Sequence, residues 1–156
     1  MKRYALFILV SLLLAACASA PPKSTVQPAC TPAAARPNAA QEGVAAGAAV
    51  VYERIGEGAC VDEVWNIYPD GRIVGDKATK TVTAAEISTL LTDIDGMGFF
   101  KLPTTKHTAC RECFTYNITV NYNGQVKTVS AVDGGTDTPV EYWQIYAKIK
   151  KLLPTS

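Results

Sequence analysis

The clearest periodic pattern in the chain is an alternation of apolar and polar residues over Phe114–Tyr122. Aromatic and aliphatic side chains hold every second position and Thr or Asn the others, which is typical of a β-strand with one buried face. An Asn-Gly pair follows at 123–124 and favours a two-residue hairpin turn. We therefore expect a return strand over 126–132, with Lys127 and Val129 on the aromatic side.

Shorter apolar runs earlier in the chain predict a second group of strands. We expect a first strand over 50–55 and a second over 64–68. The Pro-Asp-Gly sequence at 69–71 favours a tight reversal, so residues 72–75 would return as a short third strand.

The segment after these strands carries the best helix signal. Thr83 stands at the cap with Glu86 three residues later, which is the pattern of a capping box, and Gly96 is the stop. Apolar residues recur between them at helical spacing, namely Ile87, Leu90, Leu91 and Ile94.

A second helix is predicted at the end of the sequence. We expect Thr138 to be its cap, Pro139 its first residue and Glu141 the partner that completes a capping box. One face would carry apolar residues, namely Tyr142, Ile145, Ile149 and Leu152. The order of elements predicts a single α+β domain over 49–156. It would have a largely antiparallel sheet of about five strands built from two hairpin units, with two helices on one face.

The first residues have the three parts of a bacterial signal peptide. Lys2 and Arg3 give a positive start, an uncharged apolar run follows, and small residues lead to Cys17. The apolar run has about 11 residues where a membrane-spanning helix needs ~20, which favours a cleaved signal over 1–16.

The sequence Leu-Ala-Ala-Cys at 14–17 resembles the lipobox of bacterial lipoproteins. The resemblance implies that Cys17 carries diacylglycerol and often a further acyl chain, because a stable anchor needs more than one chain. The protein would then be exported and held at a membrane of the cell envelope through this lipid. Ala18 in the next position suggests the outer membrane where the host has one.

Residues 17–48 differ in composition from the rest. They are rich in Ala and Pro and nearly free of large apolar side chains, so we expect a disordered tether after the lipidated cysteine. The whole chain has a formal net charge of +1, and nothing in its charge pattern points to nucleic acid as a partner.

The remaining cysteines are Cys30, Cys60, Cys110 and Cys113. Outside the cytoplasm such a set favours disulfides. Pairing Cys60 with Cys110 or Cys113 closes about fifty residues and would stabilise the fold by ~4 kcal/mol, against ~2 kcal/mol for Cys110 with Cys113. Cys60 and Cys113 each precede a strand, and these strands would run in the same direction, so the two cysteines could meet at one end of the sheet.

A metal site is the sharper alternative, because His107 lies beside the Cys110 and Cys113 pair and Cys60 would supply a fourth ligand for a soft ion such as zinc. A redox role for the same pair is a further alternative. The chain lacks the common hydrolase, nucleotide and calcium motifs. We therefore expect no catalytic residue, metal or cofactor.

Three segments resemble a family of small uncharacterised bacterial envelope lipoproteins. They read WNIYPDGRI at 65–73, GFF at 98–100 and CFTYNITV at 113–120. The matching motifs are structural, so the resemblance implies no catalytic residue. We expect a non-catalytic envelope module that binds an envelope protein or a cell-wall partner, with an inhibitor of a secreted hydrolase as the alternative.

Overall fold

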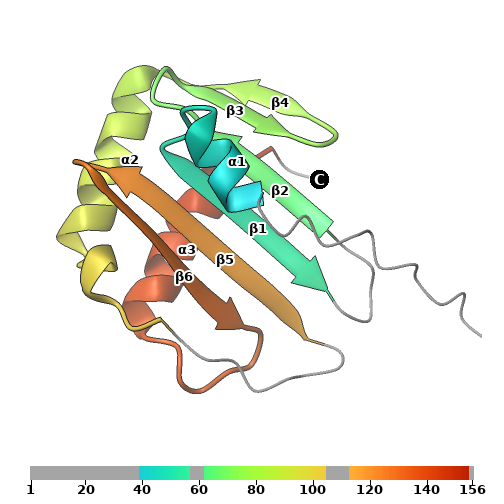
Figure 1. Cartoon of the computed structure of the whole chain (residues 1–156), viewed down its shortest axis with the longest axis vertical. Coiled ribbons are helices and arrows are strands. Elements are labelled where there is room, and N and C mark those ends of the chain that lie inside the picture. Colours follow the sequence, from blue (N-terminus) through green and yellow to red (C-terminus); the bar gives the residue numbers. More distant parts are fainter. Residues whose placement is uncertain (1–38, 57–61, 105–112, 155–156) are drawn as a thin grey trace, which may run out of the picture.

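The computed structural model describes residues 39–56, 62–104 and 113–154. One antiparallel sheet of six strands, in the order β4-β3-β2-β1-β5-β6, forms the middle of the domain (Figure 1). The strands are β1 Val50–Gly56, β2 Asp62–Ile67, β3 Arg72–Gly75, β4 Thr79–Thr81, β5 Phe114–Tyr122 and β6 Gln125–Val132. This confirms the α+β class and the antiparallel sheet.

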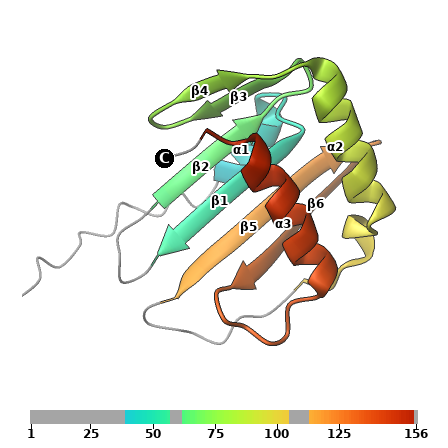
Figure 2. The ribbon, with the colours of Figure 1, turned by 180° about the vertical axis from the view of Figure 1, so that it is seen from behind.

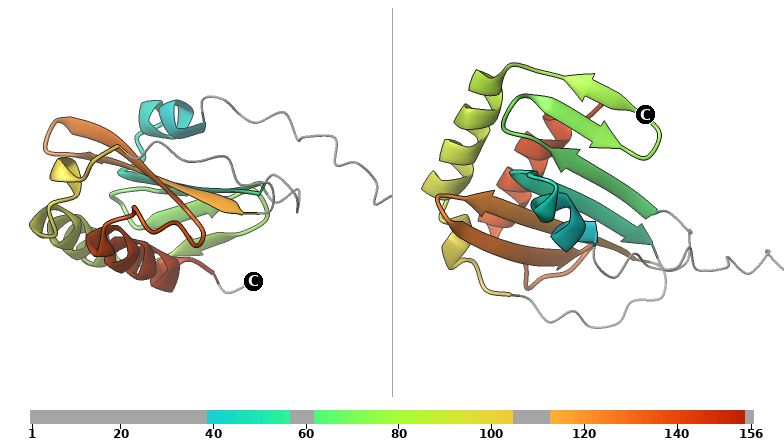
Figure 3. Two further views of the ribbon diagram at one scale, coloured as in Figure 1. Left: turned by 90° about the horizontal axis from the view of Figure 1, so that it is seen from below. Right: turned by 45° about the horizontal axis from the view of Figure 1, so that its top comes forward.

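Helices cover the two faces of the sheet unequally. Helices α2 (Ala84–Gly96) and α3 (Val140–Leu152) lie together on one face (Figure 2), and the 3-10 turn η1 (Phe99–Lys101) follows α2. The short helix α1 (Ala39–Ala45) lies on the opposite face, as the view from below shows (Figure 3). The main core therefore fills the space between the sheet and the helices α2 and α3. Its fully buried members include Tyr52, Ile67, Ile73, Ile87, Ile94, Phe99, Ile118, Tyr142, Ile145 and Ile149.

Helix α1 and strand β4 correct two of the predictions. Residues 39–48 are not part of a disordered tether, because α1 lies there and packs on β1 and β2. Its buried face uses Ala39 and Gly43 in place of large side chains, and a Cβ on Gly43 would lie 2.2 Å from Asn66 Oδ1. Close packing of small residues thus supplies the contact that composition did not indicate. Strand β4 has three residues, too few to show a periodic pattern.

The β5–β6 hairpin forms with the predicted register. Ile118 faces Val129 and Val120 faces Lys127, so Lys127 and Val129 lie on the aromatic side. Asn123 and Gly124 both have positive φ, at 50° and 74°, as the mirror-image hairpin turn requires.

The two predicted helix starts have different outcomes. The Thr83 side chain accepts a hydrogen bond from the Glu86 backbone N–H, and the Glu86 carboxylate accepts one from the Thr83 backbone, which confirms the capping box of α2. The prediction for α3 is wrong. Pro139 is its N-cap residue, with extended ψ of 147° and no side-chain cap, so Thr138 lies one residue too early.

Candidate functional site

Most of the predicted site residues lie outside the described part of the chain. Cys17, Cys60, His107 and Cys110 belong to this group. Cys113 stands just before β5 and is disulfide-bonded, so it has no thiolate to offer a metal ion. Which cysteine is its partner stays a prediction.

A disulfide between Cys60 and Cys113 requires the strands that follow them to run in the same direction. The topology around Cys113 meets this condition. Ile55 of β1 faces Asp62 at the start of β2 on one side and Thr115 near the start of β5 on the other. Strands β2 and β5 therefore run in the same direction and begin at the same end of the sheet, two strand spacings or about 10 Å apart.

A cluster of charged and aromatic side chains lies at this end of the sheet, on the side of α3. Glu63 accepts a hydrogen bond from Trp65 Nε1 at 2.7 Å and pairs with Arg54 at 3.6 Å and Lys150 at 3.7 Å. The Arg54 guanidinium lies 3.9 Å from the centre of the Phe114 ring. One carboxylate meets two cations and an indole donor, so the cluster ties β1, β2 and α3 together. The buried Arg54 Nε has no hydrogen-bond partner among the described residues.

Tyrosine and tryptophan rings continue this cluster towards the core. The Tyr142 hydroxyl donates to the Tyr116 carbonyl oxygen at 2.7 Å, and Tyr116 packs edge-on against Trp143 and Tyr146. Burial raises the pKa of Tyr142 far above its ordinary value, with smaller contributions from Tyr146 and Tyr116. Burial likewise raises the pKa of Tyr52. The contacts between these rings hold α3 against the sheet.

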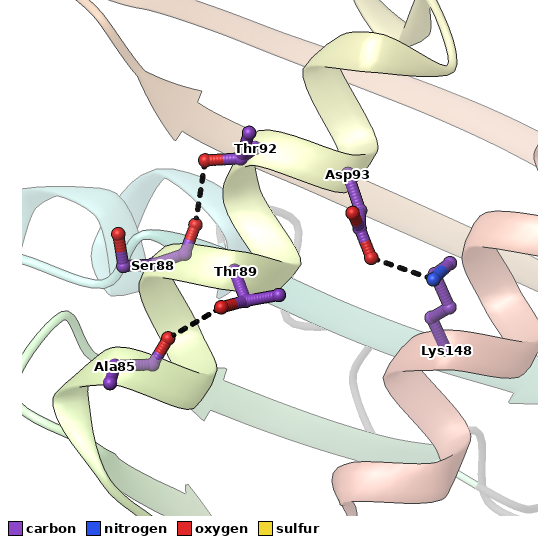
Figure 4. A network of polar contacts seen from close by, with 6 residues as sticks. All are labelled: Ala85, Ser88, Thr89, Thr92, Asp93 and Lys148. Carbon is purple, nitrogen blue, oxygen red and sulfur yellow. Dashed lines mark hydrogen bonds and ion pairs between the residues drawn. The ribbon is translucent and has the colours of Figure 1, made fainter.

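An ion pair joins α2 to α3, and two side-chain hydrogen bonds form within α2 (Figure 4). Lys148 of α3 and Asp93 of α2 form an ion pair at 2.7 Å, with about 40% of each side chain exposed. Thr89 and Thr92 donate to the carbonyl oxygens of Ala85 and Ser88, one turn earlier in α2. These two exposed hydroxyl groups of α2 thus form hydrogen bonds within their own helix.

The opposite side of β5 and β6 is different, because no helix of the described chain covers its outer part (Figure 1). We call this surface the open face, and it consists of Thr115, Asn117, Thr119, Asn121, Val126, Thr128, Ser130 and Val132. Val126 and Thr128 are its exposed members, whereas Thr119 is buried, with 2% of its surface exposed. Thr119 and Thr128 share a hydrogen bond at 2.8 Å between their hydroxyl oxygens. The open face carries no formal charge. It offers hydroxyl and amide groups that both donate and accept hydrogen bonds.

Val126 is the one apolar side chain of the open face that is strongly exposed, at 59%. Among the described residues the other large apolar side chain that is exposed is Val140, at 61%, at the start of α3. Single exposed valines are ordinary on protein surfaces. Val126 differs because it also lies on a long edge strand.

No helix in the described ranges is long and apolar enough to cross a membrane. The same ranges contain no group of three or more His, Cys, Asp or Glu side chains placed to hold a metal ion.

Comparisons with protein-family models, with curated proteins and with solved structures give no significant match to this chain. The site must therefore be judged from its own geometry. Sequence reasoning placed the Thr and Asn residues of β5 on one side of a strand, but it did not select them as a surface. The signal was the polar half of the alternation, whose exposure depends on how far α1 extends across the sheet.

Proposed function

We propose that this chain is a lipid-anchored protein of the cell envelope and acts as a non-catalytic interaction module. Two features of the sequence support the anchor, namely the three-part signal over 1–16 and the lipobox that ends in Cys17. With α1 assigned to the folded domain, the proposed tether is reduced to residues 18–38.

The observation that carries the interaction role is the open face of β5 and β6. One face of an antiparallel sheet often stays solvated, and the cores of protein interfaces are depleted in charged residues. The open face lacks charged residues over two strands of nine and eight residues, and its Asn and Thr side chains can donate and accept hydrogen bonds. We propose that it binds a protein, and that the helix-covered side serves stability.

Lipidation is tested by comparing two cysteine variants of the full chain. Cys17→Ser should lose incorporation of a labelled fatty acid and should leave the membrane fraction, because it removes the acceptor thiol. Cys30→Ser is the matched control and should keep both. Equal labelling of wild type and Cys17→Ser would refute the anchor.

Contact through the open face is tested by a photo-reactive amino acid placed at Asn121, in the full chain in its native membrane. We expect a discrete adduct of defined mass from this position. Thr89, which is exposed on α2 on the other side of the sheet, is the matched control and should give only diffuse background. The same adduct pattern from both positions would contradict a role for the open face.

A further inference from the structure

The end of the sheet where β1 stops carries side chains that the helices cover only in part. Strands β1 and β5 extend past α3 there (Figure 2). Arg54 of β1 is paired with Glu63 of β2 on one side and with Tyr116 of β5 on the other, so these side chains form a row on the helix side of the sheet. The side chains of Arg54 and Glu63 are 30% and 20% exposed. Both charged groups can therefore be reached from solvent.

Helix α3 supplies further side chains next to this row. Trp143, Tyr146 and Lys150 follow one another at intervals of three and four residues, so they share one face of the helix. The two rings are only partly buried, and Lys150 Nζ lies 3.7 Å from the Glu63 carboxylate. We call the partly exposed residues at this end the Arg54 site, which consists of Arg54, Glu63, Phe114, Trp143, Tyr146 and Lys150.

The two cations of the Arg54 site lack hydrogen bonds that other cations of the fold make. Arg54 Nε is buried without a hydrogen-bond partner among the described residues. Arg54 and Lys150 approach Glu63 only to 3.6 and 3.7 Å, which is longer than a hydrogen bond. By contrast, Arg72 and Lys148 each donate to an aspartate at 2.7 Å. A buried donor without a partner costs stability unless water or a ligand supplies an acceptor.

The chemistry of the Arg54 site indicates which ligand it fits. The Arg54 guanidinium lies 3.9 Å from the centre of the Phe114 ring, and its planar fork of donors matches a carboxylate. Two cations and one carboxylate leave the site with one positive charge, which matches one monovalent anion. Asp133, just past β6, is exposed and forms no ion pair with either cation within the described chain. The rings of Trp143 and Tyr146 offer apolar area beside the charges.

We propose that the Arg54 site binds a small ligand with one carboxylate on an apolar ring or aliphatic body. Arg54 and Lys150 hold the carboxylate, and Trp143 and Tyr146 pack against the body. A phosphate group carries up to two negative charges at neutral pH, which exceeds the charge that the site leaves. The inference goes beyond the proposed function, because it depends on neither the anchor nor the open face.

Tryptophan fluorescence tests the binding, because the chain has two tryptophans and both report on this site. Trp143 belongs to it, and Trp65 donates to Glu63. The probe for the purified full chain is cyclohexanecarboxylate, which has one carboxylate on an apolar ring. We expect a saturable change with a Kd on the order of 1 mM, as for a ligand of this size. The neutral analogue cyclohexanecarboxamide, acetate and inorganic phosphate should each bind about tenfold more weakly or less.

Four glutamine variants separate the site from charge in general. Arg54→Gln and Lys150→Gln should each weaken binding of the probe about tenfold or more, since each removes a cation that contacts the carboxylate. Arg72→Gln and Lys148→Gln are the matched controls, because they remove the same charges from cations that already have an aspartate partner, and they should leave the Kd unchanged. Circular dichroism checks the fold of each variant. Lys150 lies on the surface of α3, so its variant tests the site even where Arg54→Gln does not fold.

The proposal has three ways to fail. Fluorescence of the wild type that shows no saturable change up to about 20 mM cyclohexanecarboxylate overturns it. Equal binding of the neutral amide or of phosphate also overturns it, since a carboxylate would then not be what the site recognises. A loss of affinity in the Arg72→Gln and Lys148→Gln controls as large as in the site variants would locate the binding elsewhere.

Discussion

Along β5, Ile118 is fully buried beneath α2 and α3, whereas Asn121, three residues later, lies on the open face and is only half-buried. The two residues belong to one strand, and they point to opposite faces because side chains alternate along it. Their difference comes from the helices, which cover one side of β5 and leave most of the other side bare. Under the proposed function, stability depends on one side of this strand and recognition on the other.

The largest effect should come from the core side of β5. Ile118→Ala removes a fully buried side chain and leaves a cavity, so we expect the free energy of unfolding to fall by about 2–5 kcal/mol. Asn121→Ala on the open face should change it by less than about 0.5 kcal/mol. Urea titration of the two variants makes the comparison. A similar loss in both would show that the open face is part of the core.

The buried hydroxyl of Tyr142 should have the next largest effect. Tyr142→Phe removes its hydrogen bond to Tyr116 and leaves that buried carbonyl without this donor, which we expect to cost about 1–2 kcal/mol. Tyr122→Phe, at the half-buried end of β5, is the control and should have little effect, because no hydrogen bond of its hydroxyl is seen among the described residues. Thermal unfolding of both variants measures the difference, and an unchanged Tyr142→Phe would mean that the bond adds nothing to stability.

The two helix starts should respond unequally to loss of a threonine. Thr83→Ala breaks the capping box of α2 and should cost about 1 kcal/mol. Thr138→Ala should cost less than about 0.5 kcal/mol, because Pro139 is the N-cap residue of α3 and Thr138 makes no cap bond. Chemical denaturation distinguishes them. A larger loss for Thr138→Ala would restore the start of α3 that the sequence suggested.

The smallest effect is expected at the ion pair that joins the helices. Asp93 and Lys148 are both about 40% exposed, so a double-mutant cycle with alanine should give a coupling of about 0.2–1 kcal/mol. The coupling should decrease when the salt concentration is raised to about 1 M, since exposed charges are screened. A coupling that does not depend on salt would contradict this description of the pair.

Local signals in the sequence were sufficient for the elements that depend on local chemistry. The alternation of β5 and the Asn-Gly turn specified a hairpin and its register, and Thr83 with Glu86 specified the start of α2. Helix α1 was not predicted, because its small residues resemble those of a linker. They are buried only through contact with Val51 and Val64, which lie elsewhere in the chain. The predicted start of α3 at Thr138 was wrong, because the capping pattern did not account for Pro139, whose backbone is extended.

The open face could be predicted only in part, because a local pattern shows which residues share a side of a strand but not what covers that side. Period two showed that Asn117 and Asn121 share one side of β5, but no local pattern states whether a helix will cover that side. The answer depends on the length and position of α1, which reaches β1 and β2 and leaves β6 open. The Arg54 site likewise emerged only with the strand order, which places β1 between β2 and β5.

The most direct test compares two valines of equal exposure, Val126 at 59% and Val140 at 61%. The quantity to measure is the yield of the photo-adduct from Asn121 in the membrane-bound chain that carries Val126→Lys or Val140→Lys. Our account predicts that Val126→Lys abolishes most of the adduct, because it places a charge on the open face, whereas Val140→Lys leaves the yield unchanged. Equal yields from the two variants would contradict the claim that this face is the site of interaction.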